Sequence, residues 1–410
     1  MPFKSVDKMD EKIAFLIKAV SGNYYFSHLC AEYGISRKTG YKLLKRFERE
    51  GEAGLHDRSC RPHSVAGTVS PELVRAIVQQ RQPTKRAILG ARKIRAELLK
   101  QYEANQVPSA TTIHNVLRRE GLVKPRKAPP RRNYPVNTKN NPEQCNEIWT
   151  IDYKGHFTMG NGRRCHPLTV CDSFSRCILT IKGQYRETFR NVRQVLRQLF
   201  RKYGQPRYLL SDNGACFASI QSPCGYGRLS YWLLDHGIQP LFADPGRPGQ
   251  NGRHERMHRE LKAYCCRPPA KNLQSQNRLL NEFTEFYNFK RPHEELDQRY
   301  PGQVYEPSTV SYRDKVCAPD YGAELMVRKV TSNGAFRWGS QEWVMVNQCL
   351  TGHYVGLRRL GELSYEVYYR DVSLGLFRLG DQVESGRYYR LISDRDLPQR
   401  SRDREERKRR

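Results

Sequence analysis

Three acidic residues are placed so that a folded chain could gather them around metal ions. Asp152 lies inside an apolar segment, and Asp212 comes just after a short apolar run. Glu255 follows a glycine-rich stretch and lies 43 positions after Asp212. Mg2+ prefers carboxylate oxygens, and an unpaired carboxylate inside an apolar strand is costly without a cation. Two such ions ~3.5–4 Å apart can clamp the oxygens of a phosphodiester. The three acids together therefore predict a site for two Mg2+ ions, or Mn2+ in their place.

Other acids compete for these positions. Asp172 is better interpreted as a turn residue, and Asp244 lies within the glycine-rich loop. On a helix at about 100° per residue, Glu260 points well away from Glu255. These three acids are therefore left out of the predicted site.

The same helix offers two bases beside its acid. Arg259 and Lys262 follow Glu255 by four and seven positions, so they share nearly one helical face with it. Such a face suits contact with DNA phosphates next to a metal site. We therefore predict Arg259 and Lys262 to be DNA-binding residues.

A second motif overlaps the third acid. His254 to His258 reads His-Glu-Arg-Met-His, the pattern of zinc metalloproteases, with Glu282 downstream as a conceivable third ligand. The motif contains and follows arginines, at Arg253 and Arg256, where such enzymes have uncharged residues. A peptidase also gives no reason for a strongly basic chain. The histidines are expected to pack or to touch DNA.

The acids fall within a region of alternating strands and helices, which predicts an α/β core with a mixed sheet over residues 144–310. Period-two and apolar patterns indicate five strands, and near-helical periodicity indicates three helices. The strands are expected at 147–154, 165–171, 177–182, 206–210 and 238–242, and the helices at 188–203, 229–236 and from 253.

Short apolar runs separated by turns follow this core. They predict a small all-β barrel, SH3-like, over residues 325–393. We expect it to fold independently and to contact DNA or another subunit. Residues 394–410 form a charged tail.

The first 57 residues predict a helix-turn-helix. A short helix ends at Gly34, and Ser36 can cap a second helix that runs to Glu50. The start of the second helix would face base edges and phosphates. The alternative is a helical hairpin with a solvated basic face. The predicted DNA contacts are Arg37, Lys38, Thr39, Tyr41 and Lys42.

Residues 71–124 predict a second helical DNA-binding module. Its third helix, 109–120, begins at a capping serine and ends at Gly121. A basic, proline-rich linker over 125–143 could lie along phosphates. The predicted contacts are Thr111, Thr112, Asn115 and Arg118 on the helix, and Arg126, Lys127, Arg131 and Arg132 in the linker.

The composition agrees with a polyanionic partner. The chain has 410 residues with 71 Lys+Arg against 42 Asp+Glu, a net charge of +29. This excess of basic residues is typical of nucleic-acid-binding proteins. No run approaches the ~18 apolar residues of a membrane helix, and the start lacks a signal-peptide core. The twelve cysteines lack zinc-finger spacing and are interpreted as reduced thiols.

The acidic motifs resemble a known family. Trp149-Thr-Ile-Asp152, Leu209-Leu-Ser-Asp-Asn-Gly214 and the segment from Pro245 to Lys262 are similar to the integrase core of bacterial insertion-sequence transposases. The segment from Phe286 to Leu296 resembles the stretch that follows the glutamate helix in that group. Residues 219–229 look like an insertion, which lengthens the spacing between the second and third acids.

The resemblance implies an RNase H-like fold and a DDE triad of Asp152, Asp212 and Glu255. It implies a transposase that nicks the ends of a mobile element to free 3′-hydroxyls and joins them to target DNA. Its partners would be double-stranded DNA, at terminal repeats and target, and further copies of the chain that pair two ends. It would work in the bacterial cytoplasm, at the nucleoid. A domesticated, catalytically silent DNA-binding regulator and a stand-alone nuclease remain alternatives.

Overall fold

The computed structural model describes residues 8–57, 69–123, 142–243, 252–383 and 387–392, apart from 213, 215, 220, 221, 223 and 224. The chain divides into two compact units, Met1–Val69 and Ser70–Arg410. Each unit has its own hydrophobic core. The predicted linker contacts Arg126, Lys127, Arg131 and Arg132 lie outside the described residues, as does the charged tail.

The first unit is the expected helix-turn-helix. Its hydrophobic core holds the buried side chains of Phe15, Leu16, Leu29 and Leu55. Gly40 lets two helices approach closely, because a Cβ there would lie 2.7 Å from the Cys30 sulfur. The elements are α1 (Lys8–Val20), α2 (Phe26–Glu32), α3 (Arg37–Glu50) and the 3-10 helix η1 (Gly51–Leu55).

The second unit begins with three short helices, as predicted. Each buries apolar residues at helical spacing, such as Ile77, Ile94 and Ile113. Ser70 and Ser109 cap two of these helices by accepting backbone N–H bonds. The elements are α4 (Pro71–Arg81), α5 (Ala91–Leu98) and α6 (Ala110–Arg119).

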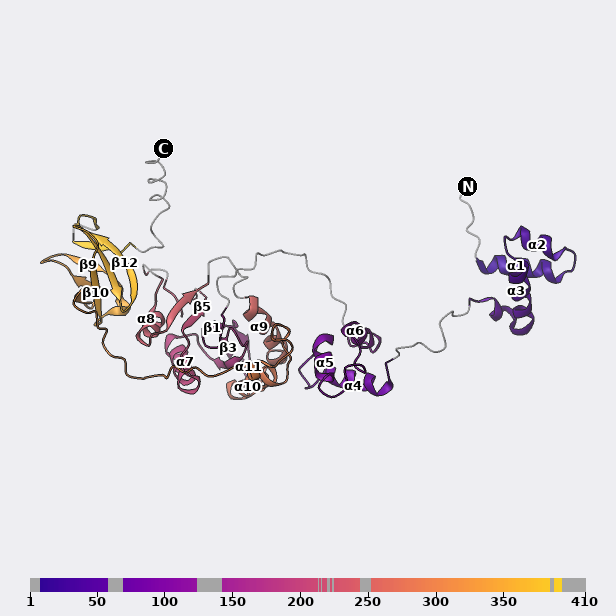
Figure 1. The fold of residues 1–410 in the computed structure, drawn as a ribbon, viewed down its shortest axis with the longest axis horizontal. Coiled ribbons are helices and arrows are strands. Elements are labelled where there is room, and N and C mark those ends of the chain that lie inside the picture. Colours follow the sequence, from indigo (N-terminus) through magenta and orange to yellow (C-terminus); the bar gives the residue numbers. More distant parts are fainter. Residues whose placement is uncertain are drawn as a thin grey trace, which may run out of the picture. The chain divides into compact units, whose positions relative to one another are not determined.

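A mixed sheet forms the centre of the second unit (Figure 1). The first strand in the chain lies in the middle, antiparallel to the third and parallel to the fifth. The sixth strand extends the parallel side, and the fourth extends the antiparallel side. The strands are β1 (Ile148–Tyr153), β2 (Phe157–Thr158), β3 (Arg164–Asp172), β4 (Ile178–Gln184), β5 (Tyr208–Ser211) and β6 (Gln239–Phe242). This arrangement confirms the predicted mixed α/β core.

Helices cover this sheet. The amphipathic α7 (Phe189–Tyr203) packs its apolar stripe onto β1 and β3. The others are α8 (Arg228–Asp235), α9 (Gly252–Cys265), α10 (Leu273–Phe289), η4 (Glu294–Leu296) and α11 (Pro301–Val304). The sequence patterns did not predict α10. Asn277 and Asn288 of that helix bond the backbone of β4 at Gly183 and Ile178, which satisfies a sheet edge that would otherwise stay open.

The packing of the α/β core continues beyond residue 310. Tyr305 and Tyr312 pack against its hydrophobic cluster. Asp314 forms ion pairs with Arg197 and Arg201 of α7. The segment up to Asp314 is therefore part of the same packed body as the sheet.

The C-terminal region is all-β apart from one short 3-10 helix within its described residues. It forms two four-stranded sheets, in the orders β12-β11-β10-β7 and β13-β14-β9-β8. We call residues 326–392 the β-domain; its closure into an SH3-like barrel stays a prediction. The elements are β7 (Met326–Lys329), β8 (Ala335–Arg337), β9 (Trp343–Met345), η5 (Gln348–Leu350), β10 (Tyr354–Arg359), β11 (Ser364–Tyr369), β12 (Val372–Arg378), β13 (Gln382–Val383) and β14 (Tyr388–Arg390).

The β-domain does not form its core alone. Tyr231 and Leu234 of α8 belong to the same buried cluster as Phe336, Val367 and Phe377. A helix of the α/β core thus supplies part of the interior of the β-domain. Its independent folding stays a prediction, and this shared core argues against it. Sequence periodicity could not reveal this, since α8 is apolar on two faces and the pattern does not name the partner of each.

Candidate active site

Asp152 lies near the end of the central strand β1, opposite Thr169 of β3. Its side chain is 19% exposed. Burial raises the pKa of this carboxyl to about 7, and the charge of Asp212 contributes further. A buried acid beside a second acid is repelled in its ionised form, and a divalent cation would relieve that repulsion.

Asp212 follows the last residue of β5. Because β5 runs parallel to β1 and pairs Ser211 with Ile151, the two aspartates stand at the same end of neighbouring strands. Asp212 Oδ1 accepts a hydrogen bond from the Gly214 N–H at 3.0 Å, which begins the turn that leaves the sheet. The structure thus brings together the first two acids of the predicted triad.

Glu255 lies in the first turn of α9 and is exposed. No group of three His, Cys, Asp or Glu side chains in the described part of the chain is close enough to hold a metal ion. Glu255 is accordingly not gathered with the two aspartates in this structure. It remains a predicted ligand, one turn before a residue that does reach Asp152.

That residue is His258, whose Nδ1 lies 3.7 Å from Asp152 Oδ2. His254 and His258 are both buried, and their Nε2 atoms lie 3.1 and 2.9 Å from the Thr169 hydroxyl. The same hydroxyl donates to the Asp152 carbonyl oxygen at 2.9 Å. Since a hydroxyl has one proton, both imidazoles must then donate to it from Nε2. The three side chains fix α9 against β1.

Burial also determines the charge of these histidines. It lowers the pKa of His254 to about 4 and that of His258 to about 2. Both rings are therefore neutral at pH 7, so the contact between His258 and Asp152 is not an ion pair. The His-Glu-Arg-Met-His motif serves packing, as the sequence analysis favoured over a zinc site.

Two of the three excluded acids have structural partners, and the third, Asp244, lies outside the described residues. Asp172 is fully buried and accepts hydrogen bonds from the Asn146 and Ser175 backbones. Glu260 pairs with Arg291 and lies 4.0 Å from Lys93 of α5. It faces the second helical module and not the aspartates, so it points away from the site as expected.

Two neighbours of the site escaped sequence analysis. Thr169 is a fully buried polar residue in an apolar strand, and that contrast was an available signal. Glu187 precedes α7, binds His166 at 2.8 Å and helps to raise the pKa of Asp152. No local sequence pattern points to Glu187, because it comes near β1 only in the folded chain.

The raised pKa of Asp152 predicts a pH-dependent stability difference. The folded state favours the protonated carboxyl, so this group stabilises the fold below its unfolded pKa of about 4 and loses that effect as pH rises through about 7. In chelator, Asp152→Asn should therefore raise the unfolding temperature at pH 8 and leave it nearly unchanged at pH 4. The gain is on the order of 2–4 kcal/mol at most.

Thermal unfolding of both proteins between pH 4 and pH 8 measures this difference. Glu285→Gln, at an exposed position of α10, is the matched control and should show no such trend. A difference between wild type and Asp152→Asn that stays constant over this range would contradict the prediction.

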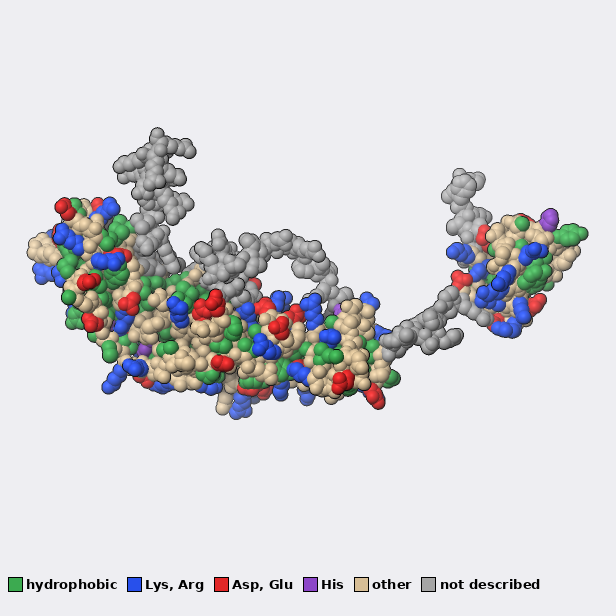
Figure 2. All heavy atoms as spheres, in the orientation of Figure 1, with side chains coloured by type: hydrophobic (Ala, Val, Ile, Leu, Met, Phe, Trp, Pro, Cys, Tyr) green, Lys and Arg blue, Asp and Glu red, His purple; other side chains and the backbone are tan. Residues whose placement is uncertain are grey.

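Apart from Thr112, the predicted DNA contacts that the structure describes are exposed. Arg37, Lys38, Thr39, Tyr41 and Lys42 are all exposed on α3. Figure 2 shows Lys and Arg side chains gathered on the first unit, and Ser36 caps α3 by accepting the Thr39 N–H. A helix start of this kind offers free N–H groups and side chains to phosphates.

The other predicted DNA contacts that the structure describes lie on helices α6 and α9. On α6, Thr112 is half-buried and shares a hydrogen bond with the capping Ser109. Arg259 and Lys262 are exposed on α9. The other predicted contacts on α6, which are Thr111, Asn115 and Arg118, are exposed.

Known families match most of these parts. An integrase core domain family matches residues 142–248, and a second of the same description matches residues 236–301. A helix-turn-helix domain matches residues 11–63, and a homeodomain-like domain matches residues 39–117. Among the described helices none is long and apolar enough to cross a membrane.

Two insertion-element proteins are similar to this chain. One is an uncharacterized 39.2 kDa protein of element IS476 from Xanthomonas euvesicatoria, 28% identical over 38% of this chain and 44% of its own length. The other is an uncharacterized 31.7 kDa protein of element IS407 from Burkholderia multivorans, 26% identical over 40% of this chain and 56% of its own. The match thus spans about half the length of these curated relatives.

Solved viral integrases also align with the chain. The HTLV-2 integrase catalytic core domain in complex with magnesium is 17% identical over 40% of this chain and all of its own, with a TM-score of 0.32. A chain in the structure of the simian T-cell lymphotropic virus intasome in complex with the PP2A regulatory subunit B56 gamma is 16% identical over 70% of this chain and 98% of its own, with a TM-score of 0.36.

Proposed function

We propose that this chain, an integrase-core protein related to bacterial insertion elements, is the transposase of such an element. It binds the element's ends, nicks them to free 3′-hydroxyls and joins these to target DNA. The observation that carries the proposal is the pair of acids, Asp152 and Asp212, at the same end of adjacent parallel strands, with the buried Asp152 carboxyl already disfavoured as a lone anion.

The acids would hold two Mg2+ ions, or Mn2+, with Glu255 as the third ligand. Such ions polarise the phosphodiester and stabilise the charge that develops on its oxygens. The rest of the work falls to the chain itself. Thr169 and His258 fix Asp152 between strand and helix, and Arg259 and Lys262 lie on the face of α9 that would contact phosphates.

The partners follow from the same proposal. Double-stranded DNA is bound at the terminal repeats by α3 and α6, and the linker over 125–143 tracks phosphates between module and core. Several copies of the chain pair two ends before they attack the target. The protein acts in the bacterial cytoplasm, at the nucleoid.

A domesticated DNA-binding regulator is the second candidate, and the exposed position of Glu255 is the observation in its favour. The test incubates the full chain and Mg2+ with labelled DNA from the gene's own flanks. A transposase gives 3′ nicks at the element ends and joined products that chelator and Asp212→Asn both remove. Specific binding with neither product would support the regulator, and nicks without joining would support a nuclease.

The position of α3 gives a prediction about end binding. Arg37→Ala or Lys38→Ala in the full chain should weaken binding to element ends by about 1–3 kcal/mol if the side chain contacts a base, and affinity should fall steeply with salt. Fluorescence anisotropy with end and random DNA measures both effects. Arg49→Ala, in the last turn of α3, is the control and should bind nearly as wild type. Equal loss in all three variants would contradict the prediction.

A further inference from the structure

Helix α8 is shared by two hydrophobic cores. Leu229 and Leu233 pack into the core of the mixed sheet, whereas Tyr231 and Leu234 pack into that of the β-domain. At about 100° per residue these pairs point to opposite sides of the helix. The β-domain is therefore seated directly on the element that follows the loop after Asp212.

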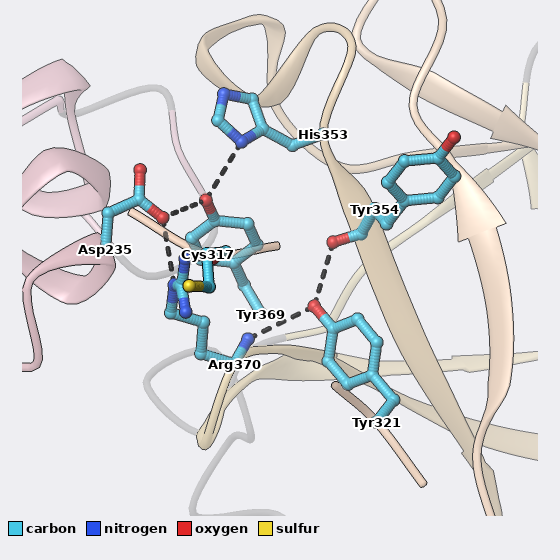
Figure 3. A network of polar contacts seen from close by, with 7 residues as sticks. All are labelled: Asp235, Cys317, Tyr321, His353, Tyr354, Tyr369 and Arg370. Carbon is cyan, nitrogen blue, oxygen red and sulfur yellow. Dashed lines mark hydrogen bonds and ion pairs between the residues drawn. The ribbon is translucent and has the colours of Figure 1, made fainter. Parts of the chain in front are cut away.

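Polar contacts fix the end of the same helix to the β-domain (Figure 3). Asp235 accepts hydrogen bonds from the Tyr369 hydroxyl at 2.6 Å and from Arg370 Nε at 2.9 Å. The Tyr369 hydroxyl also lies 3.0 Å from His353 Nδ1, and Arg370 donates to the Cys317 carbonyl oxygen. A charged pair that is mostly shielded from solvent sets one orientation between the two parts.

Asn347 of the β-domain reaches the loop itself. Its Nδ2 donates to Ser222 Oγ at 2.8 Å and to the Tyr226 carbonyl oxygen at 3.2 Å. Its Oδ1 accepts from the Cys349 N–H at 2.8 Å and caps η5. The Asn347 side chain thus bonds its own domain through Oδ1 and the loop after Asp212 through Nδ2.

A series of hydrogen bonds connects the residues that Asn347 contacts to Asp212. The Gly214 N–H donates to Asp212 Oδ1, and the Gly214 carbonyl oxygen accepts from Phe217 and Ala218. Ala218 pairs with Tyr226 in an isolated bridge, and Tyr226 is the residue that Asn347 holds. Between the sheet and α8, the described residues from 214 to 226 are therefore tied to Asp212 at one end and to the β-domain at the other.

We propose that Asn347 is a positioning residue for Asp212. The inference rests on the proposed function, in which Asp212 is a metal ligand. It gives a role to Ser222 and Tyr226, which lie in the insertion inferred over 219–229: through them the β-domain fixes the second acid. A ligand set must be held within a few tenths of an ångström to bind metal well. Asp212 follows the end of its strand, so the precision of its position depends on the contacts that fix the turn after it.

Two variants, Asn347→Asp and Asn347→Ser, test the inference in the full chain. Both keep an oxygen that can cap η5, and both lose the amide donor to Tyr226. We expect Mn2+ affinity, measured by electron paramagnetic resonance, to fall about tenfold, and amide exchange at Gly214, Phe217 and Ala218 to accelerate about tenfold. The nicking rate at saturating DNA should fall, with the half-saturating DNA concentration and the unfolding temperature nearly unchanged.

Asn333→Asp is the matched control, because Asn333 accepts bonds only from Thr331 and Ala335 of its own turn in the contacts described. Unchanged Mn2+ affinity in both Asn347 variants would overturn the inference, even if exchange at the loop amides accelerates. If Asp212→Asn binds Mn2+ as tightly as wild type, the proposed metal site fails instead. Exchange at the three amides then still decides whether Asn347 holds this loop, and unchanged exchange overturns that part as well.

Discussion

Glu255→Gln should leave DNA-end binding nearly intact while it reduces nicking and joining by about 10²-fold or more, the scale of losing one main transition-state stabiliser. The substitution keeps the shape and helix propensity of the residue and removes the charge that a Mg2+ ligand needs. Asp152→Asn and Asp212→Asn should have the same effect. Double variants should lose little more, because the three acids act as a unit. Gel assays for nicked and joined products measure these losses.

The control for this series must be chosen from the structure. Glu260→Gln, on the same helix, would disturb the contacts with Arg291 and Lys93, so a loss of activity there would not be informative. Glu285→Gln on α10 changes an exposed carboxylate away from these contacts and should remain active. Full activity of Glu255→Gln would show that the third ligand lies elsewhere.

Removal of the β-domain should destabilise the α/β core. A chain that ends at residue 315 retains the Asp314 ion pairs with α7 but exposes Tyr231 and Leu234, which are 4% and 5% exposed in the full chain. Each large apolar side chain loses about 1.5–3 kcal/mol of burial, and Asp235 loses Tyr369 and Arg370. Against a typical stability of about 5–15 kcal/mol, this loss is large. Circular dichroism should show a lower unfolding temperature for the shortened chain.

A double substitution tests whether the exposed apolar surface causes this loss of stability. Tyr231→Ser with Leu234→Lys in the shortened chain removes the uncovered apolar surface and should recover solubility, whereas the same pair in the full chain should be strongly destabilising. A chain that ends at Ile392 is the length control and should unfold as the full chain does. If the chain ending at 315 unfolds at the full chain's temperature, then the β-domain does fold apart from the core.

The spacing of apolar and capping residues was enough to predict most elements. The strand around Asp152, the helix α7 and the short helices of both amino-terminal modules follow from local pattern and side-chain capping. These features depend on residues a few positions apart, and therefore the sequence records them directly. Helix α10 was not predicted, although its buried residues Leu279, Phe283 and Phe286 recur at helical spacing.

The order of elements, the basic surfaces, and the strand and turn that carry Asp152 and Asp212 all follow from local sequence patterns. That these two acids are neighbours follows from the fold, since the parallel pairing of β1 and β5 joins residues about 60 positions apart. The fold also decided that His254 and His258 pack on Thr169, and that α8 serves two cores. Periodicity reports that a face is buried but not what buries it. That choice depends on how all the layers pack together.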